Sequence, residues 1–512
     1  MSRNMVLMCV DLGTTNIRAG AYNTKLELLA TESRKAKTEF HTSDSFIQYG
    51  DSFVESTIEV INEVVVKLGK PDVSAIGFTS QMAGMIGVDI NFNAVTVWSG
   101  TNDGRQRKYM QGMVDRYGKR ILELSGVNTP FLAPKIRWIM EEYPEQHAKV
   151  CKYMLLGGYV VGRLAADLKI EEAFTDPTVL EWTGLADLGR EKWSEELCST
   201  FGIDIARLPK IVPCNSIIGG LSDEFAARCS LKSGIPLVAG CGDKPAGCLG
   251  AGVVETGMLV DESSTVAALS FCVDKFEADT KYNTLEIIPS AISGQFFALS
   301  YIIGSGITTE WFVKTFTGEI ARQAKSEGIS IFEKLDKMAS QVKPGSEGLL
   351  CINAFGGKAL PFDLNMKGSF TGLKWVHSIQ HFYRAMLESF AFEYGCFLSA
   401  MSGIYPHIKP YKIRVIGGGA SSDFFSQIKS DVLGLPYESL KISHPSLRGA
   451  ALLAGNAIGI FPDIKKAAKE LLQIRKTFSP NNENHLFYKE CHENYKKLLK
   501  EMKIVYSQNG AI

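Results

Sequence analysis

An aspartate stands beside a turn rich in glycine and threonine near the start of the chain, in the stretch Asp11-Leu12-Gly13-Thr14-Thr15. Backbone N–H groups and hydroxyls at such a turn hold phosphate oxygens, and a neighbouring carboxylate positions Mg²⁺ through water. The competing interpretation is an ordinary polar turn, because short motifs of glycine and threonine often arise by chance. On their chemistry, Asp11, Thr14 and Thr15 are candidates for a phosphate and metal site.

A second aspartate, Asp243, follows Gly242 at the expected junction between a strand and a helix. The free amides and the dipole at a helix N-terminus favour phosphate. A carboxylate at this junction is also able to act as a general base toward a hydroxyl group. The alternative is that Asp243 only caps the helix, which is the more common use of an aspartate there.

Three consecutive glycines, Gly417 to Gly419, precede another expected helix. Because no side chain intrudes and unusual φ values cost little, backbone of this kind approaches a flat ligand closely. The segment would suit an adenosine. It lacks the full G-x-G-x-x-G spacing, so a tight turn is the alternative.

Two further polar segments follow expected strands, Gln81-Met82-Ala83-Gly84 and Asn102-Asp103-Gly104-Arg105. Amide, carboxylate and guanidinium groups at strand ends read the hydroxyl pattern of a polyol through hydrogen bonds. For Asp103 and Arg105 the alternative is a solvated turn with a surface ion pair.

These motifs need strands and helices to hold them, and the first part of the chain shows both. Residues 6–10 and 17–22 have the pattern of a β-hairpin whose polar tip begins at Asp11. Residues 53–68 place apolar side chains near helical spacing, and residues 73–79 return to an apolar strand. Helices and strands therefore alternate.

The middle of the chain repeats this opening. A strand over residues 236–240 is followed by a helix of small residues over 246–254. A second hairpin is expected from strands at 256–260 and 266–272, joined by a polar tip at 261–265. Two hydroxyl-bearing tips about half a chain apart indicate a duplicated architecture.

The last part of the chain supplies one more glycine-rich entry to a helix. Residues 411–416 have the pattern of a strand, and residues 421–434 that of a helix which Ser421 or Ser422 is able to cap. From about residue 484 onward the chain is rich in Lys and Glu and predicts a peripheral helix.

Length, charge and cysteine usage exclude several classes of protein. A chain of 512 residues is too long for one core, so two large domains with a cleft between them are expected. Lys plus Arg and Asp plus Glu total 55 each, which leaves no overall field to attract nucleic acid or an anionic membrane. No apolar stretch reaches the roughly 20 residues that span a bilayer, and no targeting signal is apparent. Eleven cysteines without a Cys-x-x-Cys pair fit a reducing cytoplasm.

Taken in order and at these separations, the motifs resemble those of the FGGY family of carbohydrate kinases, and the match runs from about residue 5 to about residue 460. The motifs that carry the resemblance are Asp11 to Arg18, Asn102 to Arg105, Gly242-Asp243 with Ala246-Gly247, and Gly417 to Ser422 continuing through Gln427, Asp431-Val432 and Gly434 to Pro436.

The resemblance implies an α/β fold of two RNase H-like domains, the actin-like ATPase fold shared by actin, hexokinase and Hsp70 chaperones. Catalysis would take place in the cleft between the domains. The N-terminal domain, residues 1–250, would hold the sugar site and the first phosphate loop. The C-terminal domain, residues 251–512, would hold the second phosphate loop, the adenosine site and the C-terminal helix.

The family's functional residues map onto this chain as follows by resemblance. Asp243 is the base that draws the proton from the sugar hydroxyl, and Asp11 and Asp243 place the metal. The residues assigned to the nucleotide are Gly13, Thr14, Thr15, Arg18, Ser264, Thr265, Gly304, Gly418, Gly419 and Ala420. Those assigned to the sugar are Gln81, Met82, Asp103, Arg105 and Asp243.

Three segments depart from the family's pattern. One is Gly357-Lys358-Ala359-Leu360-Pro361, which stands where the family carries Gly-Glu-Arg-x-Pro. Ala83 stands where pentulose kinases of the family carry His, which removes a hydrogen-bond donor and acceptor from the sugar pocket. Ser264-Thr265 stand where the second phosphate loop usually carries Gly-Thr. The carboxylates of Asp11 and Asp243 are retained.

The resemblance implies phosphorylation of a terminal hydroxyl of a small sugar or polyol, dependent on ATP and Mg²⁺, with a pentulose such as xylulose as the first candidate. Glycerol, gluconate, ribulose and a longer ketose stay open as acceptors. From other classes, a nucleotide-dependent sugar sensor, a chaperone and a filament former are alternatives, although the retained carboxylates and the segment ending at Arg105 speak against them. A homodimer is the default oligomeric state.

Overall fold

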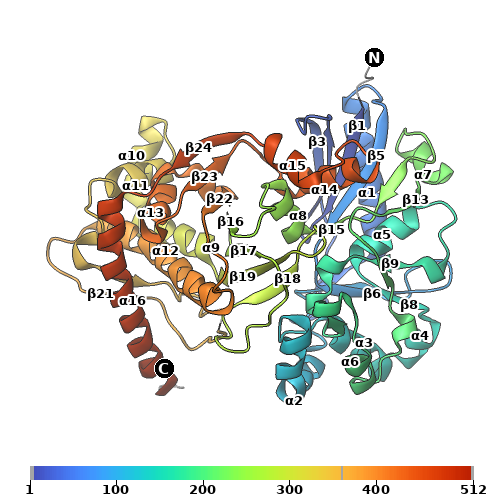
Figure 1. Ribbon diagram of the computed structural model, residues 1–512, viewed down its shortest axis with the longest axis horizontal. Helices are drawn as coiled ribbons and strands as arrows, with labels where there is room; N and C mark the ends of the chain where they lie inside the picture. The colour runs from blue at the N-terminus through green and yellow to red at the C-terminus, as the bar shows by residue number, and fades with distance from the viewer. Residues whose placement is uncertain (1–4, 359–360, 509–512) are drawn as a thin grey trace.

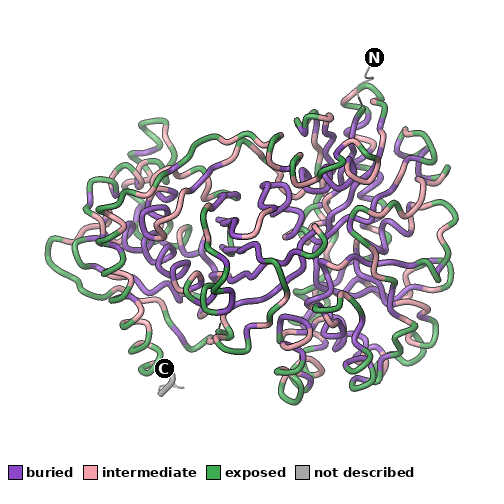
Figure 2. Tube along the Cα trace, viewed as in Figure 1, coloured by how far each residue is buried: buried purple, intermediate pink, exposed green. Residues whose placement is uncertain are grey.

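The structure is a computed structural model that describes residues 5–358 and 361–508. Two lobes lie side by side in Figure 1, one built mainly from the first half of the chain and the other mainly from the second. Each lobe contains a mixed seven-stranded sheet. Buried backbone is concentrated along both sheets and the helices next to them (Figure 2).

The sheet of the first lobe has the strand order β13-β14-β5-β1-β2-β3, with β15 pairing with β5 off this path. Its strands are β1 (Val6–Leu12), β2 (Asn16–Tyr22), β3 (Leu28–Lys35), β5 (Val73–Ser80), β13 (Ile217–Gly220), β14 (Pro236–Val238) and β15 (Cys241–Gly242). Strand β2 is antiparallel to its neighbours β1 and β3, whereas β1, β5 and β14 run parallel.

The sheet of the second lobe has the order β18-β19-β17-β16-β22-β23-β24. Its strands are β16 (Met258–Glu262), β17 (Ala267–Val273), β18 (Glu286–Pro289), β19 (Phe296–Ile302), β22 (Lys412–Ile416), β23 (Tyr437–Leu440) and β24 (Ile474–Phe478). The run β19-β17-β16-β22-β23 repeats the order and the strand directions of β3-β2-β1-β5-β14. The expected duplication is therefore present in the fold.

The first helix shows how the sequence pattern produces the core. In α1 (Gly50–Lys67), the side chains of Val54, Ile58, Ile61 and Val65 recur at intervals of three and four residues and are all buried. This spacing places them on one helix face, and the face belongs to the apolar core that β1, β2 and β5 share.

Two helices on the other face of the first sheet come from distant parts of the chain. These are α8 (Asp243–Gly250) and α14 (Pro445–Ala457), which contact each other, and α14 also contacts β1 and β5. A Cβ atom on Gly449 would lie 2.1 Å from the carbonyl oxygen of Ala246, so the helices approach this closely only because a glycine stands there. After six of the seven strands of the second sheet, the chain thus returns to the first sheet through α14.

The remaining helices cover the lobes and their edges. They are α2 (Arg107–Ser125), α3 (Leu132–Glu142), α4 (Pro144–Lys149), α5 (Leu156–Leu164), α6 (Glu195–Thr200), α7 (Asp223–Arg228), α9 (Ser305–Phe316), α10 (Gly318–Glu327), α11 (Ile331–Ala339), α12 (Ile379–Ile404), α13 (Asp423–Leu433), α15 (Ile464–Glu470) and α16 (Asn482–Gln508). A small sheet has the order β4 (Ile47–Gln48), β7 (Trp98–Gly100), β6 (Gly84–Val88), β8 (Lys152–Met154). None of the helices in the described ranges is apolar enough over a sufficient length to cross a membrane.

Candidate active site

The two key aspartates leave the same edge of the first sheet. Strand β5 lies between β1 and β15, and both neighbours run parallel to it. Thr79 of β5 is level with Asp11 on one side and with Cys241 on the other. Two strand spacings, about 10 Å, therefore separate the backbones from which Asp11 and Asp243 emerge. The carboxylates are close enough for the charge of Asp11 to raise the pKa of Asp243.

Asp243 is the first residue of α8, and Gly242 occupies the N-cap position. The carboxylate accepts a hydrogen bond from the backbone N–H of Lys244 at 2.8 Å. Asp243 thus bonds a helix amide from the first helical position rather than from the N-cap position. Asp243 is exposed to solvent.

The environment of Asp243 raises its pKa from 3.8 to about 7. The largest cause is the loss of bulk water around the carboxylate, followed by the negative charges of Asp11 and Glu262, while the cation of Lys244 acts in the opposite direction. Water reaches the carboxylate, yet protein surrounds it closely enough to disfavour its charge. A carboxylate with a pKa near neutrality suits a general base.

Asp11 keeps one carboxylate oxygen without a hydrogen-bond partner in the part of the chain that the structure describes. Its Oδ2 atom accepts a hydrogen bond from Ser446 at 3.2 Å, whereas Oδ1 is buried and has no hydrogen-bond partner among the described residues. Burial raises the pKa of Asp11 to about 6, against the opposing effects of Ser446 and of Arg18, its cross-strand neighbour on β2. A hard, unpartnered carboxylate oxygen fits Mg²⁺.

The described residues contain no group of three or more His, Cys, Asp or Glu side chains that could hold a metal ion by themselves. Mg²⁺ bound together with a nucleotide usually takes one or two protein carboxylates and completes its shell with phosphate and water. Asp11 and Asp243 meet that smaller requirement.

The first tip connects directly to the polar segment after β5. Gly13, Thr14 and Thr15 join β1 to β2, and Gly13 donates its backbone N–H to Asn16 at 3.1 Å. The hydroxyl of Thr14 donates to Oε1 of Gln81 at 3.1 Å. The structure thus brings the expected phosphate tip and the expected sugar segment together.

The second tip lies between β16 and β17. Thr265 is exposed, and the hydroxyl of Ser264 donates to the carbonyl oxygen of Val266 at 2.7 Å. The start of α9 lies against this tip, since Gly306 donates its N–H to the carbonyl oxygen of Thr265 at 3.2 Å. Gly304 is the N-cap of α9 with a φ of 70°, a left-handed conformation that favours glycine.

An ion pair joins the two lobes beside Asp243. Lys244 of α8 contacts Glu262, the last residue of β16, which directly precedes the second tip. The pair therefore links the candidate base in the first lobe to the candidate phosphate loop in the second. The sequence motifs did not reveal it, because the two residues belong to different motifs.

The glycine-rich segment forms a single 3-10 turn over Gly418–Ser421, entered through Gly417 with a φ of 85°. Gly419 donates its backbone N–H to the carbonyl oxygen of Ser263 at 2.9 Å, so this segment lies against the second tip. The helix that follows, α13, begins after Ser422, whose hydroxyl accepts a hydrogen bond from Phe425. Gly418, Gly419 and Ala420 are at least partly exposed.

The expected sugar segments are more deeply buried than a surface turn. Gln81 and Met82 are each 4% exposed, and Asp103 is fully buried. Asp103 accepts two hydrogen bonds from the guanidinium of Arg105, at 2.8 and 2.6 Å. The alternative of a solvated surface ion pair is therefore wrong for these residues.

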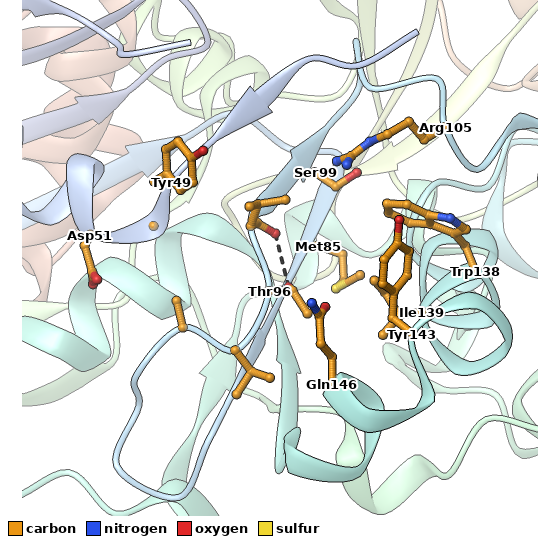
Figure 3. Close-up of a pocket in the computed structure, with 14 residues that line it drawn as sticks. Tyr49, Asp51, Met85, Thr96, Ser99, Arg105, Trp138, Ile139, Tyr143 and Gln146 are labelled. Atoms are coloured by element: carbon orange, nitrogen blue, oxygen red, sulfur yellow. Dashed lines mark hydrogen bonds between the residues drawn. The ribbon is translucent and has the colours of Figure 1, made fainter. Parts of the chain in front are cut away.

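A cavity of about 330 Å³ lies next to the segment that contains Asp103, with Ser99 and Arg105 in its lining. Figure 3 shows Arg105 and Trp138 at one of its walls and Tyr49 and Asp51 at the other. The guanidinium of Arg105 lies 4.7 Å from the centre of the Trp138 ring. Asp11 and Asp243 are not among the residues that line this cavity.

Three buried charged residues near these segments had no signal in the sequence. Lys135 of α3 is fully buried, and its ammonium donates to the carbonyl oxygen of Gly100 at 3.1 Å. Glu181 is fully buried, with no hydrogen-bond partner for either carboxylate oxygen within the described ranges. Its pKa is raised by burial and then by the charges of nearby acids, Asp243 included. Glu286 of β18 has a pKa raised to about 7, chiefly by burial.

Most of the chain matches known family models. Residues 6–250 match the family model of the FGGY family of carbohydrate kinases, N-terminal domain, and residues 277–458 match the model of the C-terminal domain of the same family. The xylulose kinase of Staphylococcus epidermidis is 26% identical over 507 residues, which cover 97% of each chain.

Solved structures show the same fold. The xylulose kinase of Lactobacillus acidophilus superposes with a TM-score of 0.88 at 21% identity, covering 98% of this chain and 99% of that one. The gluconate kinase of the same organism gives a TM-score of 0.87 at 21% identity and covers 99% of both chains. The expected two-domain kinase fold is confirmed, and the chain belongs to the FGGY family of carbohydrate kinases.

Proposed function

We propose that this kinase transfers the γ-phosphoryl group of ATP to a terminal hydroxyl of a small sugar or polyol, with a pentulose such as xylulose as the first acceptor to test. The observation that carries the proposal is the meeting of Asp11 and Asp243 at one sheet edge, with the pKa of Asp243 raised to about 7. The similarity over nearly the whole chain to a protein named xylulose kinase supports the choice of acceptor.

In the proposed reaction, Asp243 accepts the proton of the acceptor hydroxyl. The oxygen freed of its proton forms a bond to the γ-phosphorus while the bond from that phosphorus to the bridging oxygen of ADP breaks. Such transfers need little covalent help, so positioning and charge neutralisation by the protein do most of the work. Mg²⁺ held by Asp11 and Asp243 would neutralise phosphate charge.

The two tips and the glycine-rich segment are the proposed nucleotide site. Family membership supports ATP as the donor. The residues proposed to hold it are Gly13, Thr14, Thr15, Arg18, Ser264, Thr265, Gly304, Gly418, Gly419 and Ala420. The contacts of Thr265 with Gly306, and of Ser263 with Gly419, support a single continuous surface for phosphates and adenosine on the second lobe.

Gln81, Met82, Asp103 and Arg105 are the proposed acceptor side. The hydrogen bond from Thr14 to Gln81 supports this assignment, because it places an amide of the sugar segment next to the first phosphate tip. A sugar acid is the second candidate acceptor, since the fold is also that of a protein named gluconate kinase.

We also propose a division into residues 1–250 and 251–512, with the reaction between them, although α14 packs against the first sheet. All eleven cysteines are free thiols, which supports a reducing compartment such as the cytoplasm. The homodimer stays a prediction.

The test is an assay that couples ADP release to a panel of xylulose, ribulose, glycerol, gluconate and a longer ketose. We expect turnover with at least one of them, and silence with every acceptor would favour a sensor. In the variant Asp243→Asn, turnover should fall about a hundredfold to ten-thousandfold while ligand binding persists. Asp223→Asn is the matched control, because Asp223 is also the first residue of a short helix, α7. Undiminished turnover of Asp243→Asn would reject the base.

A further inference from the structure

Ser263 joins three parts of the second lobe. It directly follows β16, and only 6% of the residue is exposed. Its backbone N–H donates to the carbonyl oxygen of Ile416 at 2.9 Å, and its own carbonyl oxygen accepts from Gly419 at 2.9 Å. The first residue of the phosphate tip is thus bonded on both sides of the glycine-rich segment.

The side chain of Ser263 is hydrogen-bonded to both members of a buried ion pair, Lys429 and Asp261. Lys429 of α13 donates from its ammonium to Oδ2 of Asp261 and to the hydroxyl of Ser263, each at 2.5 Å. The Ser263 hydroxyl in turn donates to Oδ1 of Asp261 at 3.0 Å. Tyr394 donates to the same carboxylate at 2.7 Å, and the side chains of Lys429 and Asp261 are 1% and 0% exposed. This network contains one carboxylate, one ammonium, one serine hydroxyl and one tyrosine hydroxyl.

The glycine-rich segment rests directly on Ser263. A Cβ atom on Gly417 would lie 2.6 Å from the carbonyl oxygen of Ser263, and one on Gly419 would lie 2.6 Å from its Cβ atom. Ser263 and the glycine-rich segment are in direct contact, with no glycine side chain between them. A shift of Ser263 would therefore also displace this segment.

The duplicated fold shows what is special about this network. Asp261 is the penultimate residue of β16, and Asp11 is the penultimate residue of β1, the corresponding strand of the first lobe. Oδ1 of Asp11 is free of hydrogen-bond partners among the described residues, whereas both oxygens of Asp261 are engaged. The same place in the fold thus carries a carboxylate available to a ligand in one lobe and a carboxylate used for internal fixation in the other.

We propose that Lys429, Asp261 and Ser263 are positioning residues that fix the second phosphate tip relative to the glycine-rich segment. Binding of the adenine ring at that segment would then align the phosphates of ATP at the tip. This inference rests on the proposed nucleotide site. It assigns a role in ATP alignment to Lys429, which lies in a helix outside the site motifs and is 166 residues from Ser263 in sequence.

The experiment measures the dissociation constants of adenosine and of ADP by calorimetry for the wild type, Ser263→Ala and Lys429→Met. The dissociation constant of adenosine divided by that of ADP reports how much the phosphates add to binding. We expect this ratio to fall about tenfold in both variants, the size of effect that the loss of a hydrogen bond produces, with adenosine affinity retained. The KM for the acceptor should stay within about twofold while kcat falls, because the γ-phosphoryl group is misaligned.

Ser430→Ala is the matched control. It removes a fully buried hydroxyl from the same helix, one that bonds to Leu435 and Phe478 rather than to the tip. A purely structural role would weaken adenosine and ADP binding in parallel and leave the ratio unchanged, which would overturn the inference. Ser263→Ala leaves the ion pair in place and so remains informative where Lys429→Met does not fold. If the wild type bound neither adenosine nor ADP, the proposed nucleotide site itself would fail.

Discussion

At the scale of single residues, the charges around Asp243 set the pH range of the reaction. A base must be deprotonated to act, so kcat/KM for the acceptor should rise with pH as Asp243 loses its proton and level off above that range. The pKa of Asp243 is about 7 without metal, and Mg²⁺ held by the carboxylate would lower this pKa. Burial is the main cause of the raised pKa, but two neighbours adjust it in opposite directions, Glu262 upward and Lys244 downward.

Substituting these neighbours should move the acid limb of the pH profile in opposite directions. Lys244→Met removes a cation that favours the charged carboxylate, so the limb should move to higher pH. Glu262→Gln removes an anion that disfavours it, so the limb should move to lower pH. The measurement is kcat/KM between pH 5 and 9 at saturating ATP. Shifts of the same sign in both variants would contradict the assignment of Asp243 as the base.

The sequence predicted the carboxylates of Asp11 and Asp243 because each lies in a short motif, but Lys135 and Glu181 carry no such mark. Lys135 stands in an otherwise amphipathic helix, where a lysine is expected to face water. It is buried next to residues more than 30 positions earlier in the chain. Its ammonium donates to the carbonyl oxygen of Gly100, and the charge of Asp103 acts on it. Glu181 likewise lies in an irregular stretch of short turns. Burial of a charge depends on distant partners that a local pattern does not contain.

At the scale of elements, most strands and helices around the site could be predicted. Their predicted end residues are wrong where polar side chains are paired with residues distant in sequence. The pattern predicted a polar tip from residue 261 to 265, yet Asp261 and Glu262 belong to β16. Lys429 neutralises Asp261 inside the protein and Lys244 pairs with Glu262, so the strand extends two residues further. In the same way α8 begins at Asp243 rather than at residue 246.

The contact between α8 and α14 positions the base, and its closeness gives a prediction. In Gly449→Ala the new methyl group would lie 2.1 Å from the carbonyl oxygen of Ala246, so the helices must separate. We expect a loss of about 1 to 3 kcal/mol in the free energy of unfolding, typical of overpacking. The acceptor kcat/KM should also fall, because α8 carries Asp243. Denaturant unfolding and steady-state kinetics measure the two effects.

The control for this variant is Gly112→Ala in α2, where no atom lies within 4 Å of the added Cβ. Alanine favours a helix over glycine by up to about 1 kcal/mol, so this variant should be neutral or more stable. Equal stability of the two variants would show that the helices tolerate separation and would remove the argument for tight coupling.

At the scale of the whole molecule, the reacting groups belong to two lobes that the chain links in several places. Asp11 on β1 and Asp243 at the start of α8 belong to the first lobe, whereas Ser264, Thr265 and Gly418 belong to the second. The Lys244 to Glu262 ion pair and the return of α14 to the first sheet hold the lobes together at one side. An acceptor held by the first lobe and a nucleotide held between the phosphate tips of both lobes would be brought into reach by closure of the lobes.

Closure should therefore be most complete with both ligands bound. The nucleotide contacts proposed at Thr14 and Thr265 already lie on opposite lobes, and the acceptor contacts proposed at Gln81 and Asp103 would add a further group between the first lobe and the γ-phosphate. We expect the radius of gyration from small-angle X-ray scattering to fall most with a non-hydrolysable ATP analogue and acceptor together. ATP hydrolysis without acceptor should be slow, because the open site leaves the γ-phosphate unaligned. An equal decrease with the nucleotide alone would mean that the nucleotide closes the lobes by itself, and the acceptor would then have no part in excluding water.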